Sequence, residues 1–118
     1  MPVTIENIAV DAADAGRLAA FWSAVLERPV DEDANQYFAS IGRGASTMHP
    51  TMMFLQVPEE RAGKNRIHLD LVAEDHQFEL SRLERIGAKR LGDFAEYGIT
   101  WTTFADPEGN VFDVAAGH

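Results

Sequence analysis

The sequence has no cysteine among its 118 residues, which excludes disulfides, zinc sites built on thiolates and cysteine nucleophiles. Basic residues are also scarce: ten lysines and arginines stand against nineteen aspartates and glutamates, and the net charge is -9. A chain with this charge repels phosphate backbones and anionic membrane surfaces. We therefore expect no nucleic acid and no membrane among its partners.

Long apolar runs are absent as well. The longest runs are only a few residues, whereas a transmembrane helix needs roughly 20. The chain also lacks a basic start followed by an apolar stretch of signal-peptide length, so we expect no export signal. The missing cysteines are compatible with a reducing compartment, and together these features favour a cytoplasmic location.

Several catalytic motifs are missing too. The sequence contains no P-loop, dinucleotide fingerprint, nucleophile elbow or two-histidine helix motif, which makes phosphoryl transfer, Rossmann-type hydride transfer and serine hydrolysis poor candidates. With 46% hydrophobic and 25% charged residues, the composition is that of an average globular protein. A chain of this length fits one compact domain, which we expect over residues 1–118.

The pattern of apolar residues predicts two successive units with similar orders of elements. In the first unit we expect a strand at 3–12, a helix at 14–27 and strands at 36–42 and 51–57. In the second unit we expect a strand at 66–73, a helix at 75–86 and strands near 88–92, 98–105 and 110–115. An offset of 61 superimposes Asp14 on Asp75, the expected helix caps, and places Asn7 opposite His68.

This repeat predicts an α+β fold of tandem βαβββ units, over residues 1–58 and 66–118, with the polar segment 58–65 as the linker. We expect two cupped mixed sheets around a shared cavity. Edge strands of open sheets associate unless they are covered, and few lysines or prolines are placed to prevent this. A homodimer is therefore also expected.

The stretch "NRIHLDLVAED" at residues 65–75 alternates strictly along an extended chain. Its apolar positions, which we expect to face the helix, are Ile67, Leu69 and Leu71. The opposite positions are Arg66, His68, Asp70 and Val72. In the last strand the same alternation turns Asp113 away from the helix. His68, Asp70 and Asp113 are therefore expected to converge on one face of the sheet.

Each of these residues has two possible roles. His68 either contacts a ligand, as a binding group or general base, or is held by Asp70, Asp113 or the backbone. Asp70 either takes part in binding or forms a salt bridge with Arg66 or with a neighbouring strand. Trp101, close to the "DPEGN" turn, either offers a flat wall to a planar ligand or belongs to the core.

Three stretches resemble the vicinal oxygen chelate superfamily, which comprises glyoxalases, bleomycin resistance proteins and extradiol dioxygenases. They are "DAGRLAAFWSAVLERPV" at 14–30, "KNRIHLDLVAED" at 64–75 and "WTTFADPEGNVFDV" at 101–114. The resemblance covers essentially the whole chain and points to the glyoxalase-like subgroup. It implies the fold of paired βαβββ units and, again, a homodimer.

In metal-dependent members of this superfamily, each half supplies one ligand from its first strand and one glutamate from its last. The resemblance places these positions at Asn7, Gln56, His68 and Asp113. Only His68 is a ligand of the usual type, because Asp113 is one methylene shorter than glutamate. Asn7 and Gln56 offer neutral amide oxygens, which bind transition metals weakly.

Two functions follow from this pattern. The first is a small-molecule-binding protein that holds a small organic ligand through His68, Asp70, Trp101 and Asp113, without a tightly bound metal. The alternative is a divalent-metal-dependent lyase, isomerase or dioxygenase that uses His68 and Asp113. The sequence assigns no catalytic residue and no cofactor beyond this possible divalent ion.

Overall fold

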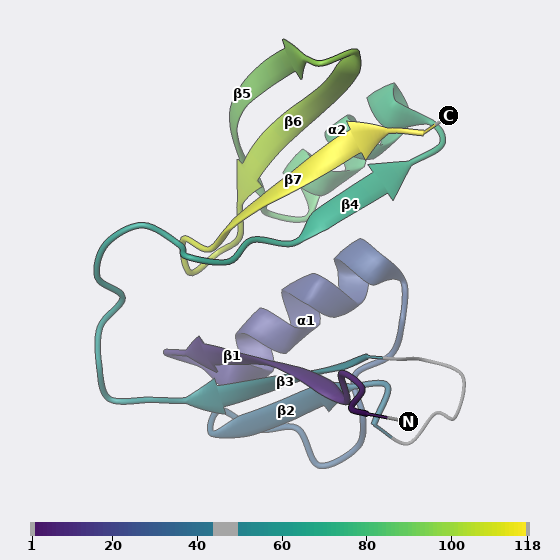
Figure 1. The fold of residues 1–118 in the computed structure, drawn as a ribbon. Coiled ribbons are helices and arrows are strands. Elements are labelled where there is room, and N and C mark those ends of the chain that lie inside the picture. Colours follow the sequence, from purple (N-terminus) through teal and green to yellow (C-terminus); the bar gives the residue numbers. More distant parts are fainter. Residues whose placement is uncertain (1, 44–49, 118) are drawn as a thin grey trace. The chain divides into compact units, whose positions relative to one another are not determined.

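The computed structural model describes residues 2–43 and 50–117. They form two compact units, Met1–Arg61 and Ala62–His118 (Figure 1). Each unit consists of one helix and one mixed sheet, with three described strands in the first unit and four in the second. The expected α+β fold is therefore confirmed. Neither helix in the described part of the chain is long and apolar enough to cross a membrane.

The sheet of the first unit has one parallel and one antiparallel pair of strands. Its elements are β1 (Asn7–Ala12), α1 (Ala15–Leu26), β2 (Phe38–Ile41) and β3 (Thr51–Gln56). In the sheet the order is β1-β3-β2, with β1 parallel and β2 antiparallel to β3. The segment between the strands expected at 36–42 and 51–57 falls mostly on 44–49, outside the described residues.

Helix α1 starts where the sequence predicts. The Asp14 carboxylate accepts a hydrogen bond from the backbone N–H of Arg17 at 3.1 Å, so it satisfies one of the free donors of the first turn. The buried face of the helix carries Leu18, Phe21, Trp22 and Val25 at spacings of three and four, and α1 packs on β2 and β3. Burial of this stripe holds the helix on its sheet.

Among its described residues, the first unit shows no additional strand of the kind that a βαβββ order requires. A single bridge between Val30 and Ile41 takes its place. Pro29 precedes this bridge and has no N–H to donate to a ladder, and Asp33 adopts a left-handed conformation with φ 71°. These two residues limit regular strand pairing to one bridge.

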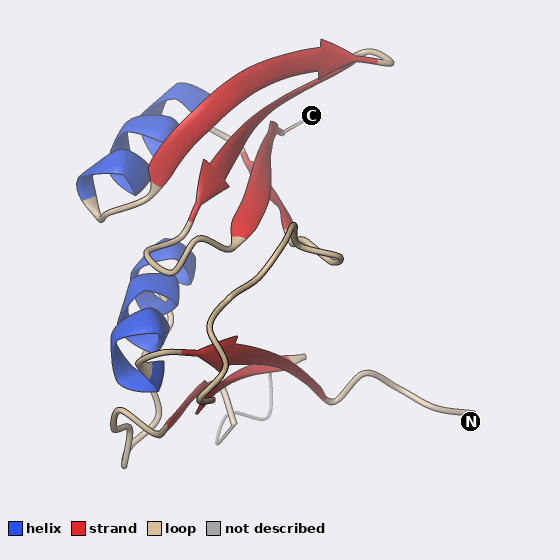
Figure 2. Cartoon of the chain, turned by 90° about the vertical axis from the view of Figure 1, so that its left-hand side faces the viewer, coloured by secondary structure: helices blue, strands red, loops and turns tan. Residues whose placement is uncertain are grey.

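The second unit has the complete order. Its elements are β4 (Asp70–Ala73), α2 (His76–Arg85), β5 (Lys89–Glu96), β6 (Ile99–Ala105) and β7 (Val111–Ala116). The sheet order is β4-β7-β6-β5, with β4 parallel to β7 and the other neighbours antiparallel. Figure 2 shows α2 lying along one side of this sheet.

The core of the second unit lies between α2 and the sheet. Asp75 caps the helix by accepting from the Phe78 N–H at 3.1 Å. Below the helix, Phe104 and Phe112 are fully or almost fully buried, and their rings stack with centroids 5.7 Å apart. The sheet surface opposite α2, here called the helix-distal face, is free to carry polar side chains.

Several expected boundaries are corrected. The strand expected at 66–73 begins only at Asp70, and Ile67, which was expected to face the helix, is 82% exposed. The strand expected at 88–92 runs on to Glu96. The first strand starts at Asn7 instead of residue 3. The extension of β5 matters most, because it adds residues to the helix-distal face.

Candidate functional site

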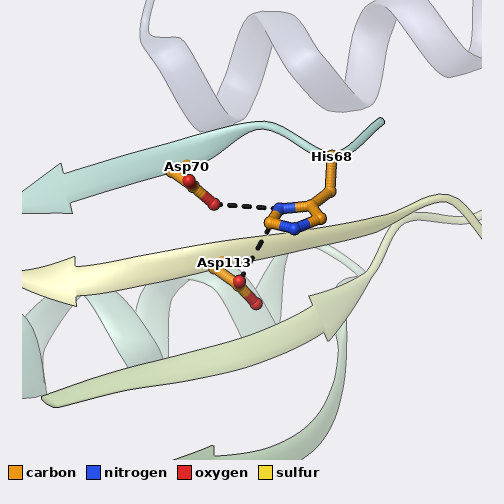
Figure 3. A group of neighbouring side chains, drawn as sticks. All are labelled: His68, Asp70 and Asp113. Atoms are coloured by element: carbon orange, nitrogen blue, oxygen red, sulfur yellow. Dashed lines mark hydrogen bonds and ion pairs between the residues drawn. The ribbon is translucent and has the colours of Figure 1, made fainter. Parts of the chain in front are cut away.

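The helix-distal face of the second sheet brings His68, Asp70 and Asp113 together (Figure 3). Nδ1 of His68 lies 2.9 Å from Oδ1 of Asp70 and 3.7 Å from Oδ2 of Asp113. One potential ligand atom from each residue lies within 4.8 Å of the others. We call these three residues the polar cluster.

Strand register explains why the cluster forms. Asp70 of β4 pairs directly with Asp113 of β7, and paired residues of neighbouring strands project from the same face. His68 lies two residues before Asp70 and extends its ring back to both carboxylates. The alternation seen in the sequence therefore positions the cluster, although His68 itself lies just outside the strand.

Thr103 is a fourth member of the site that the sequence analysis did not identify. It pairs with Asp113 from β6 and its hydroxyl donates to Oδ1 of Asp113 at 2.6 Å. Because Oδ1 is occupied in this way, Oδ2 is the oxygen that faces His68. The sequence does contain a sign of this role. Thr103 lies two residues after Trp101 in the same strand, so the two side chains are on the same face.

Burial differs across the cluster. The side chain of Asp113 is 21% exposed, that of His68 48% and that of Asp70 72%. In the neutral tautomer that carries its proton on Nδ1, His68 donates to Asp70 and presents the lone pair of Nε2 outward. This geometry suits an acceptor or proton-accepting role toward a bound molecule.

Trp101 lies on the same face as the polar cluster. Its neighbours in β6, Thr102 and Phe104, are buried toward α2, whereas Trp101 is partly exposed. Its ring stacks on that of Phe94 with centroids 5.6 Å apart and an interplanar angle of 21°. Phe94 was not identified from the sequence, because the predicted strand ended before it.

The first unit uses its amide residues differently. The side-chain oxygen of Asn7 accepts a hydrogen bond from the Thr51 hydroxyl. Gln56 donates its side-chain N–H to the backbone oxygen of Ala13 at 2.9 Å, at the end of the β1–β3 pair. Both side chains thus bond within their own unit.

Register also identifies the counterpart of Asp113 in the first unit. Ala9 pairs with Met53 as Asp70 pairs with Asp113, and Ala9 lies 61 residues before Asp70. The equivalent position is therefore Met53, three residues before the expected Gln56. Alternation alone could not find this, because it depends on how two distant strands align.

Two carboxylates outside the polar cluster have lowered pKa values. Hydrogen bonds from Thr102 first and then from Arg90 lower the pKa of Asp93. Burial acts to raise the pKa of Asp31, but hydrogen bonds from Ser40 and nearby backbone N–H groups outweigh it and lower that pKa. Both carboxylates tie local segments together and have a structural role.

The divalent ion that the resemblance implies requires donors in both units, and the residues present do not fit it. In the first unit the candidate positions hold the Asn7 amide, already bonded to Thr51, and the soft thioether of Met53. In the second unit His68 and Asp113 are suitable donors, because the hydrogen bond between Nδ1 of His68 and Asp70 leaves Nε2 available. The first unit therefore adds neither an imidazole nor a carboxylate to the ligand set that the resemblance implies, and these are the donors that a transition ion prefers.

Comparison with known proteins places the chain. A family model described as a glyoxalase-like domain matches residues 7–115. A glyoxalase/bleomycin resistance protein/dioxygenase family enzyme from Burkholderia phytofirmans PsJN aligns with TM-score 0.78 and 16% identity, covering 97% of this chain and 98% of that one. A search of curated proteins finds no significant match.

Two further solved structures share the fold. Lactoylglutathione lyase from Agrobacterium tumefaciens aligns with TM-score 0.68 and 16% identity, covering 99% of this chain and 96% of that one. Fosfomycin resistance protein FosX from Mesorhizobium loti aligns with TM-score 0.71 and 13% identity, covering 100% and 94%. At these identities the likeness shows a common fold and says nothing about a common activity. The family match over nearly the whole chain shows that this protein belongs to the glyoxalase-like domain family.

Proposed function

We propose that this protein binds a small organic molecule on the helix-distal face of the second sheet, through His68 and Asp113 and without a tightly held metal. The observation that carries the proposal is the ordered polar cluster, in which Asp70 orients His68 and Thr103 orients Asp113. Side chains fixed in this way lose little freedom when a ligand binds, so their hydrogen bonds contribute more fully to affinity.

The cluster offers complementary chemistry to a polar ligand. Nε2 of His68 accepts or donates according to its protonation, and the carboxylate of Asp113 accepts. Asp70 is the most exposed of the three and supplies a second acceptor at the edge of the sheet. Trp101 stands on the same face and adds an apolar surface to the site.

The alternative function is a divalent-metal-dependent lyase, isomerase or dioxygenase. One observation favours it: donor atoms of His68, Asp70 and Asp113 lie within 4.8 Å of one another. An imidazole and two carboxylates are donors that divalent ions accept. The amide and thioether donors of the first unit argue against it, so we rank it second.

Metal content separates the two functions. We expect untagged protein, purified without added metal, to carry far less than one transition ion per chain by elemental analysis. If the wild type retains one ion per chain and His68→Ala releases it, the metal-free proposal is wrong. The same result would favour the alternative, which an activity assay would then have to test.

Ligand binding is tested by replacing the imidazole. A fragment library screened by ligand-observed NMR supplies a binder, and its affinity is measured for the wild type and His68→Ala. Loss of one buried hydrogen bond weakens binding by about 1 to 3 kcal/mol. Lys64→Ala, at an exposed position of the second unit, serves as the control. Equal affinity for wild type and His68→Ala would refute the proposed site.

We further propose that the protein is a cytoplasmic homodimer and that both repeat units belong to one domain. Strands β4 and β5 form the two ends of the second sheet, and exposed apolar side chains include Tyr97 and Ile99 near the β5 end. Light scattering at micromolar concentration is expected to give about twice the chain mass of 13.0 kDa. A monomer mass would refute the dimer.

A further inference from the structure

The helix-distal face of the second sheet carries two neighbouring rows of side chains, which strand register defines. The polar row crosses three strands and contains Thr103, Asp113 and Asp70. The apolar row crosses four strands and contains Phe94, Trp101, Ala115 and Val72. Along each strand, the apolar row is two residues away from the polar row. Residues two apart in a strand point to the same face, so the two rows are adjacent on one surface.

The apolar row exposes surface that a globular protein ordinarily buries. Phe94 is 46% exposed and Val72 is 68% exposed, although both lie on a sheet. Between Trp101 and Val72 stands Ala115, whose side chain is a single methyl group. The short Ala115 side chain is therefore flanked by the aromatic pair on one side and by Val72 on the other. A planar molecule can lie flat on such a surface.

Gly92 keeps the aromatic pair in place. It lies two residues before Phe94 on the same face, and a Cβ built there would stand 3.3 Å from the Cε2 and Cζ atoms of the Phe94 ring. Glycine inside a strand weakens the strand and often marks such a close approach. The missing side chain therefore lets the Phe94 ring lie down along β5 and stack on Trp101.

The polar row is acidic. Asp113 and Asp70 supply two carboxylates, and Glu96 stands beyond Phe94 on the same side of β5. Side chains on diagonal positions of neighbouring strands are about 7–8 Å apart. Trp101 and Asp113 occupy such diagonal positions in β6 and β7. A carboxylate at that distance from an aromatic ring repels anions, while both groups attract a cation.

We infer that the ligand is a planar organic cation, with its ring stacked on Trp101 and Phe94 and its amidinium or ammonium group held by Asp113 and Asp70. This inference rests on the proposed function and names the class of ligand for the same site. It adds Phe94, Trp101 and Gly92 as the residues that select a flat ring, and the carboxylates as the groups that select positive charge.

Two probes of the same shape and opposite charge test the inference. The 2-naphthamidinium ion and 2-naphthoate share a planar frame, and each is titrated into the full-length protein. The chain has two tryptophans, so the spectrum of ¹⁵N-labelled protein contains two indole signals, which a Trp101→Phe variant assigns. Binding of the cation is expected to shift the Trp101 signal, with an affinity at least about tenfold above that of the anion.

Variants separate the two contributions. Asp113→Asn keeps the shape of the side chain and is expected to reduce the preference for the cation by on the order of tenfold. Trp101→Leu is expected to weaken both probes by about two- to fivefold. Glu59→Gln removes the same charge from an exposed position of the first unit and is expected to change neither.

The outcomes distinguish this inference from the proposed function. If 2-naphthoate binds as tightly as 2-naphthamidinium, or if neither probe shifts the Trp101 signal, the assignment of a planar cation is overturned. The proposed function survives either result as long as a different binder still depends on His68. A cation preference that Asp113→Asn removes and Glu59→Gln leaves intact supports the inference.

Discussion

The hydroxyl of Thr103 is expected to stabilise both the fold and the site, and Thr103→Val tests this with an almost isosteric change. The substitution removes the 2.6 Å hydrogen bond to Oδ1 of Asp113. Hydrogen bonds to charged groups contribute about 1.5–3 kcal/mol, and water replaces little of this because the Asp113 side chain is only 21% exposed. Valine recovers a few tenths of a kcal/mol through its strand preference. We expect a net loss of about 1–2 kcal/mol in the free energy of unfolding.

Urea unfolding followed by circular dichroism measures this loss. Thr100→Val is the matched control, because it makes the same change at an exposed position of the same strand. Thr103→Val is also expected to weaken 2-naphthamidinium binding several-fold, since Asp113 is then free to turn away from the ligand. If Thr103→Val and Thr100→Val have equal stabilities, the hydrogen bond does not hold Asp113 and the reasoning is wrong.

Three further predictions concern the second unit. Asp75→Ala removes the helix cap and should lower the free energy of unfolding by about 1 kcal/mol in urea titrations. An unchanged free energy of unfolding would contradict the capping role. Phe104→Ala empties a fully buried position and should cost about 3–5 kcal/mol by the same measurement, so a loss below 1 kcal/mol would count against the packing. Because its pKa in the folded state lies below the ordinary value of 3.8, Asp93 stabilises the fold above that pH and loses this effect as pH falls through the lower value. The thermal midpoint should therefore fall more between pH 6 and pH 3 for the wild type than for Asp93→Asn, and parallel curves would contradict this.

The features that the sequence predicts well are local. Asp14 and Asp75 cap helices because an acceptor side chain precedes an apolar stripe, and both parts of that signal lie within one short segment. The alternation that turns Asp70 and Asp113 away from the helix is local as well. Short-range periodicity therefore sufficed to predict the fold class and the polar cluster.

The features that the sequence does not predict depend on pairing between distant strands. Strand β5 continues past its bulge between Arg90 and Gly92, because Phe94 and its neighbours pair with β6. The role of Thr103 follows only when β6 and β7 are aligned, and the same is true of Met53 in β3. Register is a tertiary property, and a single sequence does not specify it at this precision.

The two units show how one arrangement of strands carries different chemistry. In both, the first strand runs parallel to the last, and the register places Ala9 beside Met53 in one unit and Asp70 beside Asp113 in the other. The N-cap of the helix is an aspartate in both, because each helix needs an acceptor for the free N–H groups of its first turn. The paired positions on the helix-distal side are less constrained by packing, so an apolar pair and an acidic pair are both compatible with the fold. The proposed ligand site is therefore assigned to the second unit, where those positions carry the acidic pair and Trp101 stands beside it.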